Sequence, residues 1–192
     1  MEQILFVNAC VREQSRTREL AKHLLDKLEG AVTEVDLDQG KITPLDRSAL
    51  AKRDEAVKNK NYDHPMLHYA NQFARADTVV VAAPYWDLSF PALLKVYLEQ
   101  ITVSGVTFRY NEQGIPVSLC RAKRLLYVTT AGGPIHWDFG FPYMEALARG
   151  FFGIQEVVCF KAEGLDIIGA DITEILARTK REIDHWIREK ST

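Results

Sequence analysis

Five apolar stretches, separated by amphipathic ones, define the plan of the chain. The most continuous runs from Val79 to Ala83, and a valine-rich run of this kind is typical of a strand buried on both faces, as in a parallel sheet. Pro84 cannot donate to a strand ladder, so this strand should end before it. The other predicted strands cover residues 4–8, 32–37, 125–129 and 156–160.

Apolar residues three and four positions apart predict helices between these strands. The first helix should begin near Thr17 and end at Gly30. Short joints between strand, helix and strand imply right-handed parallel crossovers. Further helices are predicted from residue 65, over 91–103, around 142–152 and after 171.

Two of these helices have recognisable starts. Ser89 is predicted to cap the helix over 91–103, with Pro91 in its first turn. Asp171 and Glu174 form a capping-box-like pair ahead of the last helix.

Two segments interrupt the alternation. Residues 38–64 carry charges, a glycine and a proline, with a modest helical signal around Leu50; we interpret them as an irregular surface segment and a candidate flap near a site. Residues 106–117 hold two short β-prone stretches around a turn and predict a β-hairpin. Pro116 indicates that the hairpin lies at an edge.

Five strands, each followed by a helix, predict an α/β fold with a doubly wound parallel sheet and helices on both faces. We expect a single domain over residues 1–192 with the flavodoxin-like strand order 2-1-3-4-5 and the hairpin as an excursion. This order gathers the loops after strands one, three and four around one crevice.

Composition narrows the function classes. Of 192 residues, 47% are hydrophobic and the formal charge is −2, so neither nucleic acid nor an acidic membrane surface is an expected partner. No apolar run approaches the roughly 20 residues of a membrane span, and the amino terminus does not resemble a secretion signal. Three distant cysteines without a CxxC pair predict no metal site and a reducing cytoplasmic location.

The first loop suits an anion. Ser15, Arg16 and Thr17 stand at a predicted helix start, where free amides, two hydroxyls and the helix dipole favour a phosphate. Thr17 acting only as a cap is the simpler alternative.

The same loop permits a second interpretation. Cys10 followed by Arg16 after five residues has the layout of a cysteine phosphatase, with a thiolate nucleophile and an arginine around a phosphate. Glu13 argues against it, because it would place negative charge inside a loop for a dianion. A small buried residue is the other role for Cys10.

The third and fourth loops suit a flat ring. Tyr85 and Trp86 offer aromatic surface after the central strand, and Asp87 can accept a hydrogen bond, although both aromatics would equally serve as core residues. Gly132 in the fourth loop lets backbone approach a ring edge. His136 just beyond is a candidate to protonate a reduced product.

Several motifs together resemble one family. They are Ser15–Thr17, Ala83–Lys95, Gly105–Tyr110, Thr129–Pro134 and Phe151–Ile154, in order along the chain. This set is similar to the FMN-dependent NAD(P)H:quinone oxidoreductase and azoreductase family of the flavodoxin-like fold.

The resemblance implies a function and a site. NADH or NADPH would reduce bound FMN, which would pass two electrons to a quinone or azo acceptor, in a homodimer with the site at the interface. Ser15, Arg16 and Thr17 would hold the phosphate, and His136 would be the catalytic candidate. The residues expected to line the flavin ring are Pro84, Tyr85, Trp86, Asp87, Leu88, Thr130, Ala131, Gly132 and Gly133.

Two departures affect this expectation. Asp87 replaces a family asparagine and Ala9 a frequent serine, so the flavin potential and the substrate are left open. A flavodoxin-type electron carrier is a further alternative, although such carriers have strongly acidic surfaces.

Overall fold

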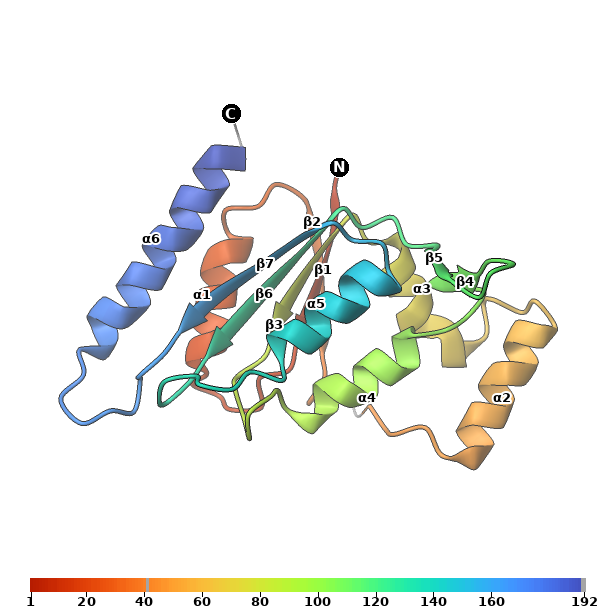
Figure 1. Ribbon diagram of the computed structural model, residues 1–192, viewed down its shortest axis with the longest axis horizontal. Helices are drawn as coiled ribbons and strands as arrows, with labels where there is room; N and C mark the ends of the chain where they lie inside the picture. The colour runs from red at the N-terminus through yellow and green to blue at the C-terminus, as the bar shows by residue number, and fades with distance from the viewer. Residues whose placement is uncertain (41, 191–192) are drawn as a thin grey trace.

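A five-stranded parallel sheet lies at the centre of the computed structural model, which describes residues 1–40 and 42–190 (Figure 1). Its strand order, β2-β1-β3-β6-β7, confirms the predicted 2-1-3-4-5 order of the doubly wound sheet. The strands are β1 Gln3–Asn8, β2 Ala31–Asp36, β3 Thr78–Ala82, β6 Arg124–Thr130 and β7 Glu156–Ala162.

The hydrophobic pattern explains which strands lie inside. All five residues of β3 are buried, as its unbroken apolar sequence predicted, because helices cover both faces of the sheet there. Along β1 the side chains alternate, so Leu5 and Val7 enter one core and Ile4 and Phe6 the other. Strand β2 lies at an edge and is largely exposed.

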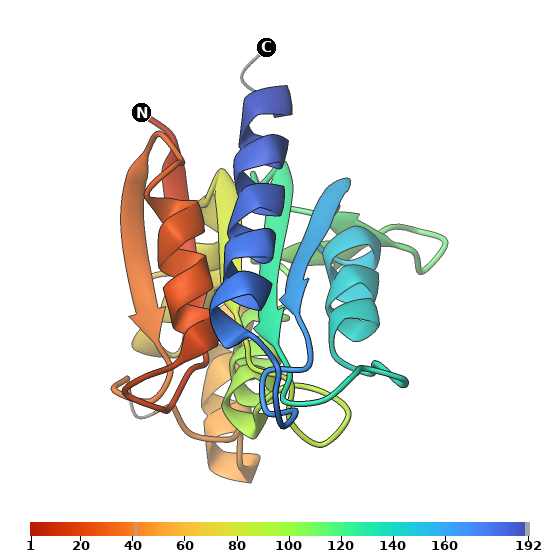
Figure 2. The same ribbon diagram turned by 90° about the vertical axis from the view of Figure 1, so that its left-hand side faces the viewer.

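Helices flank the sheet in two layers, as two perpendicular views show (Figures 1 and 2). The core on one face is completed by α1 (Arg16–Leu25) and α6 (Ile172–Lys190). The other face is covered by α3 (His68–Arg75), α4 (Ala92–Ile101) and α5 (Phe141–Gly150). Within the described residues, no helix is both long and apolar enough to cross a bilayer.

Segment 38–64 was predicted to be irregular, but the structure differs. Lys41 lies outside the described residues. Most of the segment's second half is a helix, α2 (Arg47–Lys58), followed by the 3₁₀ turn η1 (Pro65–Leu67). Asp46 caps α2 by accepting a hydrogen bond from the Ala49 amide at 2.7 Å. The helix buries only Ala56 among its described residues, so it carries little of the periodic apolar signal on which the prediction relied.

Two helix ends also differ from the predictions. Helix α1 ends at Leu25 rather than Gly30, which lies in the turn before β2; there a Cβ would come within 2.7 Å of the Glu2 carbonyl oxygen. Pro91 occupies the N-cap position of α4 in place of Ser89, whose hydroxyl instead donates to the Phe139 carbonyl.

Two smaller predictions are confirmed, the second of them in part. The hairpin pairs β4 (Phe108–Tyr110) with β5 (Pro116–Ser118) as a separate antiparallel sheet. The Asp171 half of the capping-box-like pair is present at the start of α6, where Asp171 accepts from the Glu174 amide at 3.0 Å, while the Glu174 carboxylate accepts from Arg181 instead.

Candidate functional site

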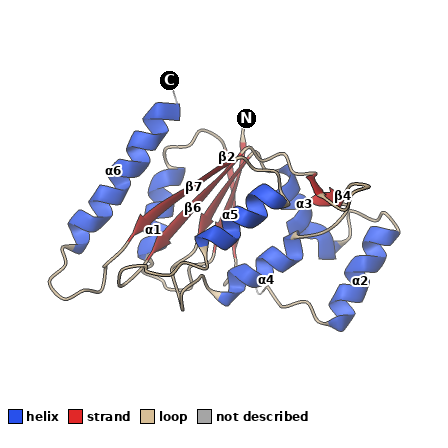
Figure 3. Ribbon diagram, viewed as in Figure 1, coloured by secondary structure: helices blue, strands red, loops and turns tan. Residues whose placement is uncertain are grey.

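The loops at the carboxyl ends of the strands enclose a cavity of about 270 Å³. In Figure 3 these loops gather beyond the arrowheads of the sheet, where a doubly wound fold binds its ligands. The cavity brings together most of the predicted site residues. Those that line it are Ser15, Arg16, Thr17, Pro84, Tyr85, Trp86, Thr130, Ala131 and Gly132.

The start of α1 forms one end of the cavity. Ser15 is its N-cap, and its hydroxyl oxygen accepts from the Arg18 amide at 3.2 Å. Arg16 and Thr17 come first and second in the helix, where no helical carbonyl can accept from their N–H groups. With the positive end of the helix dipole, these amides suit an anion.

The hydroxyl of Thr17 has a structural task. Thr17 is buried, and its Oγ1 lies 2.6 Å from that of Thr130, which joins α1 to the end of β6. The Thr17 hydroxyl therefore links the first and fourth loops, while Thr17 also lines the cavity.

Arg18 shapes the first loop from outside the cavity. Its Nη2 donates to the carbonyl oxygens of Arg12 at 2.6 Å and Glu13 at 2.7 Å. The loop is therefore held on the start of α1, with Arg12 lining the cavity.

Cys10 is a buried thiol. It is 2% exposed, and its Sγ lies 3.7 Å from the Ala82 carbonyl oxygen. Burial raises the pKa of Cys10 to about 11, against smaller lowering effects of Ser15 and Arg18. The thiol is therefore protonated at neutral pH and is a poor nucleophile, which argues against the phosphatase interpretation.

The third loop contains a tight turn. Trp86 and Ser89 exchange backbone hydrogen bonds of 3.0 and 2.8 Å around Asp87 and Leu88, whose φ angles are 50° and 66°. Two successive positive φ angles correspond to a type I′ turn, which asparagine and aspartate favour and leucine disfavours. The turn leaves Asp87 and Leu88 exposed, outside the residues that line the cavity.

The fourth loop is tied to the third. The Tyr85 hydroxyl donates to the Trp137 carbonyl at 2.6 Å, and the Phe139 amide donates to the Leu88 carbonyl at 2.9 Å. Trp137 and Phe139 nevertheless remain 65% and 63% exposed. These bonds leave two large aromatic side chains on the surface beside the site.

His136 is exposed and, like Gly133, is not among the lining residues. Its neighbour Ile135 donates its amide to Glu163 Oε2 at 3.1 Å. Burial acts to raise the pKa of Glu163, but hydrogen bonds from Lys161 and Ile135 outweigh it and lower the pKa. Glu163 is therefore a carboxylate that holds the fourth loop next to His136.

Sequence reasoning missed the loop after β7. Leu165 and Asp166 line the cavity, and Arg16 Nη1 donates to the Leu165 carbonyl at 3.1 Å and to Asp166 Oδ1 at 2.8 Å. A signal was available, because Asp166 follows a predicted strand that is the neighbour of the fourth strand in the predicted order. Only three loops were assigned to the crevice, so it was not used.

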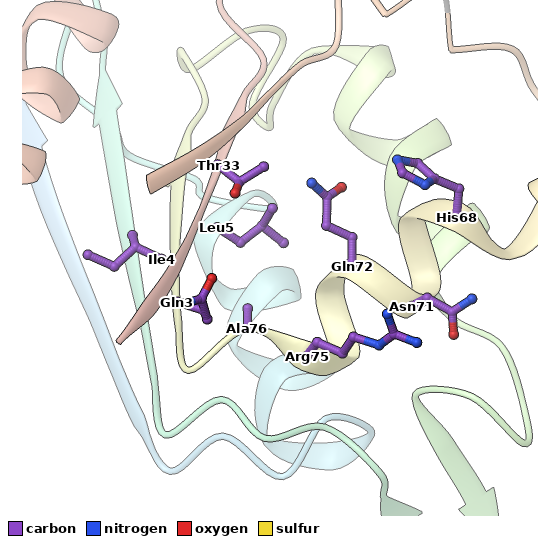
Figure 4. A pocket seen from close by; sticks show the side chains of 9 residues that line it. All are labelled: Gln3, Ile4, Leu5, Thr33, His68, Asn71, Gln72, Arg75 and Ala76. Carbon is purple, nitrogen blue, oxygen red and sulfur yellow. The ribbon is translucent and has the colours of Figure 1, made fainter. Parts of the chain in front are cut away.

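A second cavity of about 270 Å³ lies between α3 and strands β1 and β2 (Figure 4). Gln72 points from α3 into it, toward Thr33 on β2. None of the predicted site residues lines it. The first cavity is therefore the candidate site. In the described part of the chain, no cluster of three histidine, cysteine, aspartate or glutamate residues is arranged to hold a metal.

Comparison with known proteins agrees with this geometry. Residues 2–187 match the family model described as flavodoxin-like fold. The chain is 33% identical to the FMN-dependent NADH:quinone oxidoreductase of Coprothermobacter proteolyticus and 34% identical to FMN-dependent NADH:quinone oxidoreductase 2 of Clostridium acetobutylicum. Both alignments cover 98% of this chain and 100% of the relative.

A solved structure extends the comparison. The crystal structure of an azoreductase from Bacillus anthracis superposes with a TM-score of 0.83 at 25% identity, covering 98% of this chain and 100% of that one. The chain therefore belongs to the flavodoxin-like fold family, in the group whose members are named FMN-dependent NADH:quinone oxidoreductases and azoreductases.

Proposed function

We propose that this protein is an FMN-dependent oxidoreductase that takes two electrons from NADH and passes them to a quinone or azo-type acceptor. The observation that supports this most is that one cavity is lined both by the amino terminus of α1 and by the aromatic residues Tyr85 and Trp86. The relatives are named for FMN and NADH, which favours NADH over NADPH. The hydride chemistry is what an FMN ring supplies when bound.

The phosphate end of this proposed site is the start of α1. Ser15 can still donate its hydroxyl proton while its oxygen accepts from the Arg18 amide. The amides of Arg16 and Thr17 add two donors, and the guanidinium groups of Arg12 and Arg16 add positive charge along the cavity lining. These groups suit a phosphate monoester.

The ring end is proposed to lie between the third and fourth loops. Trp86 offers an aromatic surface, and Pro84, Tyr85 and Thr130 to Gly132 complete this part of the lining. Asp87, Leu88 and Gly133 lie beside it, so we assign them to the outer edge of the ring. Partial burial, with the negative charges of Asp138 and Glu163, raises the pKa of Tyr85, so its hydroxyl remains the donor to Trp137.

His136 is proposed to give a proton to the reduced acceptor. Two observations support this role. His136 follows Ile135, whose amide binds the Glu163 carboxylate, and its ring lies against Trp137. Replacing His136 with glutamine should slow acceptor reduction and leave FMN affinity unchanged. An equal loss of FMN binding would contradict the assignment.

We further propose a cytoplasmic homodimer, with residues 1–192 as one FMN-binding domain. Exposed Trp137 and Phe139 beside the cavity support a partner surface, because large apolar patches next to a site favour contact. The three cysteines are free thiols, which suits a reducing compartment.

The test is spectroscopic and kinetic. Purified protein, reconstituted with FMN and freed of excess, should show flavin absorption, and NADH should bleach it without oxygen. Adding a quinone or an azo dye should restore the absorption in a second, separate half-reaction. A protein that does not bind FMN when titrated with it would refute the proposal. Flavin that NADH cannot reduce would favour the electron carrier instead.

A further inference from the structure

One ion pair spans the phosphate end of the cavity. Arg16 Nη1, on the first residue of α1, lies 2.8 Å from Asp166 Oδ1 and 3.1 Å from the Leu165 carbonyl oxygen. The partners are 150 residues apart in sequence, and both side chains belong to residues that line the cavity. The pair therefore joins the first loop to the loop after β7 at the place proposed for a phosphate.

The fold holds Asp166 in this position. Its amide donates to the Gly132 carbonyl at 2.9 Å, and the Leu165 amide donates to the Ala131 carbonyl at 3.2 Å. The carboxylate also lies against Gly132, where a Cβ would come within 2.3 Å of Asp166 Oδ2. Glycine at position 132 makes room for the carboxylate, so its approach to the cavity depends on two loops rather than on one free side chain.

A carboxylate is out of place in an anion site. Among the described lining residues, the charged ones are Arg12, Arg16 and Asp166, so the carboxylate offsets one of two cations. The Arg16 and Asp166 side chains are 38% and 68% exposed, so the pair is weak and can be broken at small cost. A phosphate dianion offers the guanidinium a stronger, charge-assisted partner.

We propose that Asp166 is a specificity-determining residue that competes with the flavin phosphate for Arg16, given the FMN site proposed above. Without ligand, Asp166 holds the guanidinium. A phosphate must draw Arg16 away and tolerate a nearby carboxylate, so FMN is held less tightly than the same loops would otherwise allow. Riboflavin, which has no phosphate, does not compete and is indifferent to Asp166. The chain is thereby suited to an exchangeable cofactor.

The experiment measures binding to apoprotein rather than turnover. FMN and riboflavin are each titrated by flavin fluorescence into the wild type and the Asp166→Asn variant. The variant should bind FMN more tightly by about two- to fivefold, the upper part of the range that an exposed ion pair spans, and its riboflavin affinity should change by less than about twofold. Asp26→Asn is the matched control, because it removes the same charge at the far end of α1 and should change neither affinity.

A double variant separates competition for Arg16 from simple repulsion. If Asp166 acts through Arg16, adding Asp166→Asn to Arg16→Gln should improve FMN affinity less than about twofold. An equal gain in both backgrounds would overturn the competition.

Weaker or unchanged FMN binding by Asp166→Asn would overturn the proposal, as would a parallel change in riboflavin, which would mean a contact to the shared part of the flavin. Wild-type apoprotein that binds neither flavin would instead refute the FMN function itself.

Discussion

Single side chains at this site take their chemistry from their neighbours. Cys10 stands in a string that suits a nucleophile, yet it packs in the core formed by α1 and α6 against the sheet. Thr17 has a hydroxyl suited to a phosphate, yet this hydroxyl binds Thr130. In both cases the residue type allowed two roles, and burial decides between them.

The buried thiol leads to a prediction about pH. Because the pKa of Cys10 is raised to about 11, the native thiol should be alkylated by iodoacetamide at pH 8 roughly 100-fold more slowly than in urea. Since the pKa of Cys10 is about 9 in the unfolded chain and about 11 in the folded one, its contribution to the free energy of unfolding should be complete below pH 9. It should be lost as the pH rises from about 9 to about 11.

Mass spectrometry of the Cys10 peptide measures the alkylation. Cys10→Ser should retain NADH oxidation, so rapid alkylation of the native protein together with an inactive serine variant would restore the nucleophile hypothesis.

Gly132 and Gly133 form a matched pair for substitution. A Cβ on Gly132 would collide with Asp166, whereas one on Gly133 would meet no described atom within 4 Å. Gly132→Ala should therefore lower the free energy of unfolding by about 0.5–1 kcal/mol, because the Asp166 carboxylate must move and give up its exposed ion pair, and Gly133→Ala should leave it close to wild type. Urea denaturation compares the two. An Asp166→Ala background should relieve most of the Gly132→Ala cost, and equal costs in both backgrounds would rule out the collision.

At the scale of elements, helix ends determine what the loops can bind. Helix α1 presents its amino terminus to the cavity because Ser15 caps it and Arg18 fixes the loop ahead of it. Helix α2 has an equally good cap in Asp46, but it stands away from the crevice. A capped helix start is therefore a candidate anion site only where the topology brings it to the crevice.

These two caps allow binding to be separated from stability. Ser15→Ala should cost about 1 kcal/mol of folding stability, and in addition roughly 1–3 kcal/mol of FMN affinity through the lost hydroxyl. Asp46→Ala should cost a similar amount of stability and leave FMN affinity unchanged. Thermal unfolding and flavin titration measure the two effects. Equal FMN affinity in both variants would show that Ser15 only caps the helix.

At the scale of the whole molecule, the strand order converts distant segments into one site. Loops following β1, β3, β6 and β7 meet at one edge of the sheet because these strands are neighbours and parallel. The same arrangement leaves Trp137 and Phe139 beside the cavity mouth and Tyr110 on the hairpin, all more than half exposed. These are the surfaces available to a second copy.

The proposed dimer is best tested at Tyr110. Phe108 on the same hairpin is buried against Phe151, so a charge there would unfold the chain rather than separate subunits. Tyr110→Asp places two like charges at a two-fold contact and should shift sedimentation toward monomer. Val32→Asp, at an exposed apolar residue of the edge strand β2 that does not line the cavity, is the control. A flavin-loaded, active monomer of the wild type would contradict the dimer.

The predictions from sequence succeeded where local pattern and physics coincide. Unbroken apolar runs and helical periodicity located all five core strands and most helices, because burial on both faces of a sheet leaves a signal in consecutive residues. Segment 38–64 was predicted only in part. The modest helical signal around Leu50 does fall in α2, but this helix buries one residue and is capped by Asp46, so its periodicity was too weak to define it. The prediction of Ser89 as a helix cap was wrong because its hydroxyl donates to the Phe139 carbonyl, 50 residues away in sequence.

The sequence by itself determined the five strands and the doubly wound parallel plan, since these follow from hydrophobic pattern, turn residues and the handedness of crossovers. The flavodoxin-like strand order was chosen among doubly wound orders, and the structure confirms it. Only the tertiary structure decided which groups face the cavity. It turned Asp87, Leu88 and His136 outward, buried the side chain of Cys10 although this residue lines the cavity, and brought Asp166 to Arg16 from 150 residues away. Pairings of this kind depend on through-space distances, which the periodicity of a chain does not encode.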